Sequence, residues 1–121
     1  MNLFQLGKFI SHAGNELEWK IECDALTDED WDCLAKMISE RCKFGSVYGI
    51  PRGGTKLANA LEKYIDPTNP HRLVVDDVYT TGKSMRDVLT GTDIGFVVFS
   101  RQRIVLTPDH YVRALFTMDI L

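Results

Sequence analysis

Short apolar runs alternate with amphipathic segments from residue 28 onwards, and this order limits the fold of the chain more than any other feature. The runs have the length and composition of buried strands. They are SVYGIP (46–51), RLVVDDV (72–78), IGFVVFS (94–100) and YVRALFTM (111–118). Helical spacing separates the first three runs, so we predict a three-layer α/β domain with a mostly parallel sheet. Ligands of such sheets bind beyond the carboxyl ends of the strands.

The clearest predicted helix covers residues 28–42. Thr27 and Asp30 have the spacing of a capping box, in which two side chains satisfy free N–H groups at the start of a helix. The predicted buried face consists of residues at helical spacing, namely Trp31, Leu34, Ile38 and Cys42. Because Cys42 continues this stripe, we predict a buried thiol there.

Two further helices and one loop are predicted in the middle of the chain. The first helix follows Gly54 and presents the apolar stripe Leu57, Ala58, Leu61, Tyr64 and Ile65. The second is short and covers residues 83–90. Between them, DPTNP (66–70) contains two prolines and an asparagine and is predicted to be a loop.

The N-terminal segments FISH and ELEWKIEC alternate apolar and polar residues around a turn at residues 13–15. This pattern predicts two short strands. At 121 residues the chain has the length of one domain with a single core. We therefore predict a single domain over 1–121, with a small β element in residues 1–26 and an α/β core in 27–121.

Composition excludes several classes of function. The net charge is −3 and the isoelectric point is near 5.5, which lacks the basic character of proteins that bind nucleic acid or anionic membranes. The 3 cysteines include no CxxC pair, so we expect reduced thiols and a cytoplasmic location. The N-terminus lacks the pattern of a signal peptide, and IGFVVF is too short to span a bilayer.

The segment LVVDDVYTTGKSM (73–85) contains the densest group of polar residues after a predicted strand. Its end resembles an ATP-binding P-loop, which requires G-x-x-x-x-G-K-[ST]. Gly82 and Lys83 satisfy the later positions, but Asp77 stands where the first glycine must be. An aspartate there prevents the tight turn and places negative charge against phosphate. We therefore reject an ATPase.

The same segment suits a phosphorylated sugar. Thr80, Thr81 and Ser84 supply hydroxyl groups, Gly82 allows a tight bend, and Lys83 adds positive charge. The start of a helix behind them favours an anion of phosphate size. Carboxylates only accept hydrogen bonds, so Asp76 and Asp77 suit sugar hydroxyls better than phosphate.

This segment resembles the phosphoribosyl diphosphate (PRPP) motif of type I phosphoribosyltransferases, in which a hydrophobic strand ends in two acidic residues. The resemblance implies that Asp76 and Asp77 are catalytic. It also implies that the 5′-phosphate is bound by the loop residues Thr80, Thr81, Gly82, Lys83 and Ser84. Lys83 stands where the family often has a second glycine. The implied cofactor is Mg²⁺, held through the phosphates of PRPP rather than by direct protein ligands.

YGIPRGG (48–54) follows the preceding strand, where the family has its pyrophosphate loop. The resemblance implies pyrophosphate binding by Arg52, Gly53 and Gly54, since arginine can bind two phosphate oxygens and glycine allows close approach of the backbone. A cis peptide is common in this loop of the family and would correspond to the Pro51–Arg52 bond.

Residues 4–26 are similar to the hood of orotate phosphoribosyltransferases, which covers the base. Gly14 is kept, while His12 replaces a lysine and Trp19 corresponds to the first aromatic residue of the hood pattern. Arg101, in FSRQR (99–103), corresponds to an arginine that recognises the base, and a guanidinium can bind a carboxylate in bidentate fashion. The resemblance therefore implies base binding by Arg101, Trp19 and His12. His71 and His110 are predicted to be surface histidines.

One family element is missing. Orotate phosphoribosyltransferases have a long mobile loop that closes over the leaving pyrophosphate, between the positions of Ile65 and Arg72. This chain has only DPTNPH there, which is too short to be a lid.

Three hypotheses follow from these observations. The leading one is a minimal phosphoribosyltransferase that transfers ribose 5-phosphate from PRPP to a nucleobase, orotate or another pyrimidine-like base. The second is a non-catalytic regulatory protein that binds PRPP or a nucleotide. The third is a degenerate scaffold that acts in oligomeric assembly. Family members are commonly dimers, so a homodimer is a further expectation.

Overall fold

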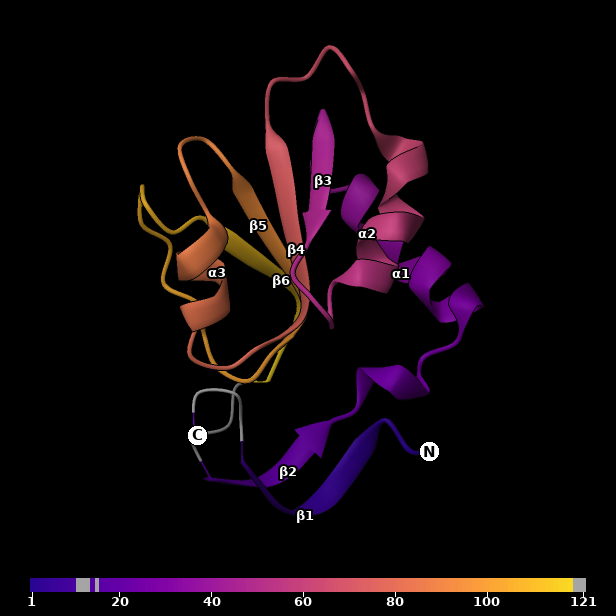
Figure 1. Cartoon of the computed structure of the whole chain (residues 1–121), viewed down its shortest axis with the longest axis vertical. Helices are drawn as coiled ribbons and strands as arrows, with labels where there is room; N and C mark the ends of the chain where they lie inside the picture. Colours follow the sequence, from indigo (N-terminus) through magenta and orange to yellow (C-terminus); the bar gives the residue numbers. More distant parts are fainter. Residues whose placement is uncertain (11–13, 15, 119–121) are drawn as a thin grey trace.

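The structure is a computed structural model that describes residues 1–10, 14 and 16–118. Its elements in chain order are β1 (Phe4–Ile10), β2 (Glu16–Ile21), η1 (Cys23–Ala25), α1 (Asp28–Ser39), β3 (Ser46–Gly49), α2 (Thr55–Leu61), η2 (Glu62–Tyr64), β4 (Arg72–Tyr79), α3 (Lys83–Val88), β5 (Ile94–Ser100) and β6 (Val112–Thr117). The elements η1 and η2 are single turns of 3-10 helix. The predicted order of strands and helices is confirmed (Figure 1).

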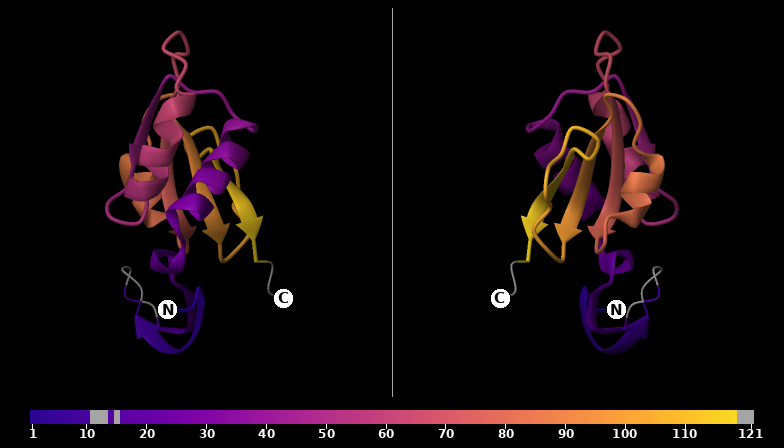
Figure 2. Two further views of the ribbon diagram at one scale, coloured as in Figure 1. Left: turned by 90° about the vertical axis from the view of Figure 1, so that its right-hand side faces the viewer. Right: turned by 90° about the vertical axis from the view of Figure 1, so that its left-hand side faces the viewer.

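Strands β3 to β6 form a parallel sheet in the spatial order β3-β4-β5-β6. Helices α1 and α2 cover one face and α3 covers the other, which confirms the three layers (Figures 1 and 2). Strands β1 and β2 pair antiparallel and form a separate small sheet beyond the carboxyl ends of the core strands (Figure 1). We keep the name hood for this small sheet. The predicted fold class is therefore confirmed.

Successive side chains of β4 point to opposite faces of the sheet, and each face is covered by helices. On β4, Leu73 and Val75 pack into the larger apolar cluster with α1 and α2. Val74 points to the opposite face and packs in a smaller cluster with Met85 of α3. All four side chains are almost completely buried. A strand that is buried on both faces must be apolar at consecutive positions, which is why the run LVV predicts a central strand.

Helix α1 begins at the predicted capping box. Thr27 Oγ1 accepts from the backbone N–H of Asp30 at 3.1 Å, and Asp30 Oδ2 accepts from the N–H of Thr27 at 2.9 Å. The helix ends at Ser39, so Cys42 lies beyond its last turn and is only half-buried. The prediction of a buried Cys42 is therefore wrong, because the helical stripe stops before it. Within the described residues, the helices lack the length and apolar composition that a membrane span requires.

Residues 66–71 form a short loop at the amino ends of β3 and β4, as predicted. The N–H of Asp66 donates to the carbonyl of Phe44 at 3.0 Å, and the N–H of Gly45 donates to the carbonyl of His71 at 2.8 Å. Residues that follow the strands lie at the other edge of the sheet (Figure 1). The segment that corresponds to the family's mobile loop is thus both short and remote from that edge.

Residues 101–111 connect β5 to β6 without a helix, although such parallel connections are usually helical. An isolated β-bridge joins Thr107 to His110, and the His110 residue is only 8% exposed to solvent. The prediction that His110 lies at the surface is therefore wrong, because this connection packs it against Tyr79 of β4. His71 is half-buried, with Nδ1 3.1 Å from the carbonyl oxygen of Thr92.

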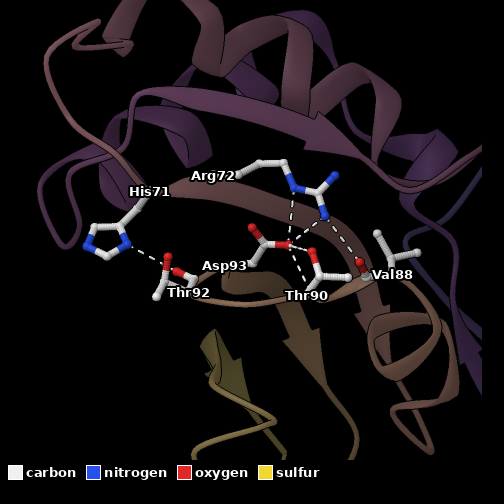
Figure 3. A network of polar contacts seen from close by, with 6 residues as sticks. All are labelled: His71, Arg72, Val88, Thr90, Thr92 and Asp93. Carbon is white, nitrogen blue, oxygen red and sulfur yellow. Dashed lines mark hydrogen bonds and ion pairs between the residues drawn. The ribbon is translucent and has the colours of Figure 1, made fainter.

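A polar network joins the start of β4 to the connection between α3 and β5 (Figure 3). Asp93 Oδ2 accepts from Arg72 Nε at 3.2 Å, from Arg72 Nη2 at 2.5 Å and from the N–H of Thr90 at 2.9 Å. Arg72 Nη2 also donates to the carbonyl of Val88 at 3.1 Å. The hydrogen bonds from Arg72 and Thr90 hold the pKa of Asp93 below its usual value. This network fixes the end of α3 against the sheet.

Replacing Asp93 by asparagine should lower the free energy of unfolding by about 1–3 kcal/mol, because the negative charge that strengthens the hydrogen bonds from Arg72 and Thr90 is lost. The measurement is urea unfolding at neutral pH. Asp87→Asn is the matched control, since Asp87 and Lys83 form an exposed pair one helical turn apart. Its expected cost is at most about 0.5 kcal/mol. Equal costs for the two variants would contradict the importance of the network.

Candidate functional site

A cavity of about 390 Å³ lies between the hood and the carboxyl ends of the core strands. Its lining includes residues in or just after the carboxyl-terminal ends of three neighbouring strands, namely Arg52, Gly53, Asp76, Asp77, Thr80 and Arg101. The hood contributes Phe9 and Ile10 of β1 and Lys20 of β2. Segments that are far apart in the sequence therefore meet at the edge of the sheet where ligands of α/β domains bind.

A second cavity of about 220 Å³ adjoins the first along residues 80–84. Both are lined by Asp76, Thr80 and Ser84, and the second also by Thr81, Gly82 and Lys83. The structure thus places the predicted phosphate-binding residues around one hollow. The acidic pair lies where the two hollows meet, because Asp76 lines both and Asp77 lines the first.

The two carboxylates differ in burial. Asp76 is 9% exposed, and its Oδ1 accepts from the N–H of Asp77 at 2.8 Å. Asp77 is half-buried, and its Oδ1 accepts from the N–H of Val78 at 2.7 Å. Burial, together with the adjacent Asp77, raises the pKa of Asp76 well above its usual range. A ligand with hydroxyl donors or a cation would favour the charged form of this carboxyl.

The loop of residues 80–84 turns at Gly82, whose φ of +82° lies in the left-handed region. A Cβ at this position would also collide with the hydroxyl of Tyr79. The turn therefore requires glycine for two reasons. Lys83 Nζ forms an ion pair with Asp87 Oδ2 at 2.6 Å, so its charge is partly compensated. Because α3 has only 6 residues, hydroxyl and N–H groups of the loop must do most of any anion binding.

The loop of residues 50–54 packs against the acidic pair. The Pro51–Arg52 peptide is cis, as the resemblance implies. A Cβ on Gly53 would collide with the carboxylate of Asp77, and one on Gly54 with the carbonyl of Val75. Arg52 is exposed and lines the larger cavity. The glycines therefore let this loop approach the strand that carries Asp77, with the arginine at the edge of the cavity.

Arg101 joins the core to the hood. Its Nη1 donates to the carbonyl of Trp19 at 2.7 Å, and its guanidinium lies 3.5 Å from the centre of the Trp19 ring. Arg101 lines the larger cavity, whereas Trp19 is not among the residues that line it and contacts Arg101 instead. His12 lies outside the described residues. Of the residues predicted to bind a base, the structure places Arg101 at the cavity.

Lys20 and the pair Tyr79–His110 were not singled out by sequence reasoning. Lys20 lines the larger cavity, and its Nζ lies 3.1 Å from Glu22 and 4.8 Å from the centre of the Phe9 ring. Its position on a predicted strand of the hood is the one sequence feature that could have placed Lys20 at the cavity. Tyr79 Oη lies 2.8 Å from Nε2 of His110, which is 31 positions away. Local pattern carries no signal for a contact of that sequence separation.

The donor set at the acidic pair can be compared with the needs of Mg²⁺, the cofactor that the resemblance implies. Within the described ranges, no group of three or more His, Cys, Asp or Glu side chains is placed to hold a metal. Asp76 and Asp77 nevertheless present oxygen ligands in the same cavity as the Arg52 loop. Such a pair fits an ion that is bound mostly by phosphate oxygens and water, which is how Mg²⁺ is usually held.

Comparison with solved structures identifies the fold. The orotate phosphoribosyltransferase of Aeropyrum pernix superimposes with a TM-score of 0.73 at 18% sequence identity, covering 96% of this chain and 89% of that one. The orotate phosphoribosyltransferase of Mycobacterium tuberculosis gives 0.61 at 14% identity, covering 95% and 89%. The UMP synthase of Leishmania donovani gives 0.70 at 13% identity over 96% of this chain, which spans about a third (34%) of that protein.

The chain therefore has the fold of type I phosphoribosyltransferases, and its arrangement is that of a shortened orotate phosphoribosyltransferase. Neither a family model nor a curated protein sequence matches the chain. The shared fold thus rests on the structure, at identities too low for sequence comparison to carry residue roles across. Those roles have to be argued from the chemistry of the site.

Proposed function

We propose that this protein is a phosphoribosyltransferase. It binds PRPP and transfers ribose 5-phosphate to a ring nitrogen of a nucleobase, with release of pyrophosphate. The observation that most supports this proposal is that the acidic pair, the 80–84 loop and Arg52 line two adjoining cavities. A site for simple phosphate binding would need neither of the two carboxylates nor a second loop with an arginine.

The proposed reaction forms a bond from the base nitrogen to the anomeric carbon and breaks the bond from that carbon to the pyrophosphate oxygen. The electron pair of the broken bond leaves with pyrophosphate, and the proton of the base nitrogen passes to water or to the released pyrophosphate. Positive charge develops on the ribose, and negative charge develops on the leaving group. Asp76 and Asp77 hold the ribose hydroxyls and stabilise the positive charge by their negative field.

Three further parts of the site act on the remaining groups of the substrate. The 80–84 loop binds the 5′-phosphate through hydroxyl and N–H groups. Arg52 and the N–H groups of Gly53 and Gly54 bind the pyrophosphate. Bound Mg²⁺ would neutralise charge on the pyrophosphate and would be held mainly by phosphate oxygens and water, with Asp76 and Asp77 as the carboxylates that line the same cavity.

The test is phosphorus NMR of the protein with Mg²⁺, PRPP and a panel of bases that includes orotate and uracil. Growth of a pyrophosphate signal that depends on one base would support the proposal and identify the acceptor. PRPP signals that broaden without any pyrophosphate would overturn it. The binding-only alternative would then be correct.

Arg101 is the proposed determinant of the base. Its guanidinium lies at the cavity edge and is held by Trp19, so it is oriented before a ligand arrives. If the base carries a carboxylate, as orotate does, Arg101→Gln should raise KM for that base by at least about tenfold, because a bidentate contact is lost. KM for PRPP should change by less than about twofold. Steady-state kinetics with each substrate varied in turn decides this, and equal changes in both constants would contradict the assignment.

One observation favours a non-catalytic PRPP-binding protein as the second candidate. The 66–71 loop is short and lies at the opposite edge of the sheet, so it cannot close over the pyrophosphate (Figure 1). Enzymes of this kind exclude water from the reacting groups, commonly by a lid. Stabilisation of the protein by Mg²⁺ and PRPP in thermal unfolding, without turnover, is the result this candidate expects.

A further inference from the structure

We propose that Tyr79, His110 and Arg86 position the 80–84 loop, so that its hydroxyl and N–H groups face the cavity in which a phosphate would bind. The identity of the ligand in this inference rests on the proposed function. The contacts that hold the loop are observed in the structure and do not depend on that function. The three residues come from β4, the β5–β6 connection and α3, so three separate segments hold the loop.

Tyr79 is the last residue of β4 and immediately precedes the loop. It is 6% exposed, and its Oη lies 2.8 Å from Nε2 of His110. The two rings are tilted, with centroids 5.9 Å apart. The carbonyl of Tyr79 accepts from the N–H of Arg101 at 2.9 Å, so the backbone at this point is also fixed. A buried tyrosine hydroxyl needs a polar partner, and His110 supplies it.

The hydroxyl of Tyr79 determines how the loop turns. It lies so close to Gly82 that a Cβ there would collide with it. Gly82 therefore turns in the left-handed conformation directly over the tyrosine. Because His110 holds the hydroxyl in place, the position of the turn depends on a residue that lies 28 positions beyond it in the sequence and belongs to another connection.

Arg86 holds the same loop from the side of α3. Its Nη2 donates to the carbonyl of Thr81 at 2.7 Å, and its N–H donates to the carbonyl of Gly82 at 2.9 Å. The carbonyl of Thr81 is thus held on the side of Arg86, while within the loop the N–H of Lys83 donates to Thr81 Oγ1 at 3.4 Å. Burial and the charge of Arg86 lower the pKa of His110, so His110 is neutral and adds no competing positive charge behind the loop.

The experiment measures affinity for inorganic phosphate and for Mg²⁺-PRPP in the full chain, with amide shifts of Thr81 and Gly82 followed by NMR. Tyr79→Phe keeps the ring and removes the hydroxyl. We expect it to weaken both affinities by about tenfold, the size of one lost hydrogen bond, and to change kcat at saturating PRPP by less than about twofold. His110→Phe should have the same effect, while His110→Gln, which keeps a polar partner, should retain most of the affinity.

The matched control is Tyr111→Phe, the same change at the exposed residue next to His110. It should leave both affinities unchanged. The double variant Tyr79→Phe/His110→Phe should bind no more weakly than either single variant, because the two side chains act as one unit. Unchanged phosphate affinity in Tyr79→Phe with a lowered melting temperature would overturn the proposal, since the pair would then be structural only. Should Tyr79→Phe fail to fold, the contrast between His110→Phe and His110→Gln gives the same decision: equal phosphate affinity in these two variants would overturn the proposal.

Failure of this inference and failure of the proposed function have different results. Phosphate binding with a Gly82 amide shift, weakened about tenfold in Tyr79→Phe but without turnover of PRPP by the wild-type protein, would overturn the enzyme and keep the positioning role. Turnover with identical KM for PRPP in the wild-type protein and Tyr79→Phe would keep the enzyme and overturn the positioning role. Absence of any phosphate-dependent shift at the loop of the wild-type protein would also overturn it.

Discussion

Asp77→Asn is expected to lower turnover of PRPP by roughly 100-fold or more while the chain keeps its fold. The substitution removes the charge and leaves the shape. Loss of a single preorganised group that stabilises transition-state charge commonly costs 10²–10³ in rate. Asp77 is the half-buried member of the pair and lines the cavity beside Arg52 and Gly53. Its charge therefore lies beside the loop that would hold the pyrophosphate.

The structure explains why this variant should still fold. Asp77 Oδ1 accepts from the N–H of Val78, and the amide oxygen of asparagine can accept the same bond. Gly53 leaves space for the side chain, and an amide occupies nearly the same volume as a carboxylate. The charge that is removed lies next to the buried Asp76, so its loss also relieves a repulsion.

Initial rates of pyrophosphate release, measured with saturating base and PRPP, test this prediction. Asp32→Asn on α1 is the matched control, because Asp32 is exposed and its ion pair with Lys63 is long at 3.6 Å. Its turnover should equal that of the wild-type protein. Turnover of Asp77→Asn within twofold of this control would remove the acidic pair from the mechanism.

The sequence predicted the core of the fold because its determinants are local. The run LVV on β4 is apolar at consecutive positions, as a strand buried on both faces must be, and the Thr27–Asp30 capping box marks the start of α1. Where a determinant is not local, the prediction was wrong. Cys42 continues the apolar stripe of α1, but the helix has already ended, and helix ends respond to the packing of the next segment.

The same distinction between local and non-local determinants applies to the candidate site. Asp76 and Asp77 at the end of β4 and the 80–84 loop after it form a contiguous segment, so a single pattern predicts them together. His110 is 31 positions from its partner Tyr79, and Arg101 is 82 positions from Trp19. Those contacts depend on how the β5–β6 connection and the hood pack against the sheet. Single-residue periodicity contains no such information, and His110 was accordingly predicted at the surface.

The stability of the protein should fall as the pH rises towards the alkaline side, and Asp76 is the expected cause. Burial and the neighbouring Asp77 raise the pKa of Asp76 in the folded state above the unfolded value of about 3.9. Between these two pKa values the folded state binds a proton that the unfolded state has lost. Stability then decreases with rising pH, by at most about 1.4 kcal/mol per pH unit for one proton. Above the folded-state pKa the decrease ends, because both states are ionised.

Asp76→Asn should remove this dependence. Asparagine is neutral at every pH, and its amide oxygen can still accept from the N–H of Asp77. The variant should therefore be more stable than the wild-type protein at about pH 8, with a difference that shrinks as the pH falls and the wild-type carboxyl becomes protonated. Urea unfolding of both proteins between about pH 5 and pH 9 measures that difference.

Two further variants test whether Asp76 is the source of the pH dependence of stability. Asp77→Asn removes the adjacent charge and should shift the wild-type dependence to lower pH without abolishing it, since burial of Asp76 remains. Asp32→Asn should follow the wild-type curve. If Asp76→Asn and the wild-type protein change in parallel with pH, Asp76 is ionised in the free protein over the whole range. The site would then hold its charged form without a ligand, and binding of PRPP would need no change in protonation.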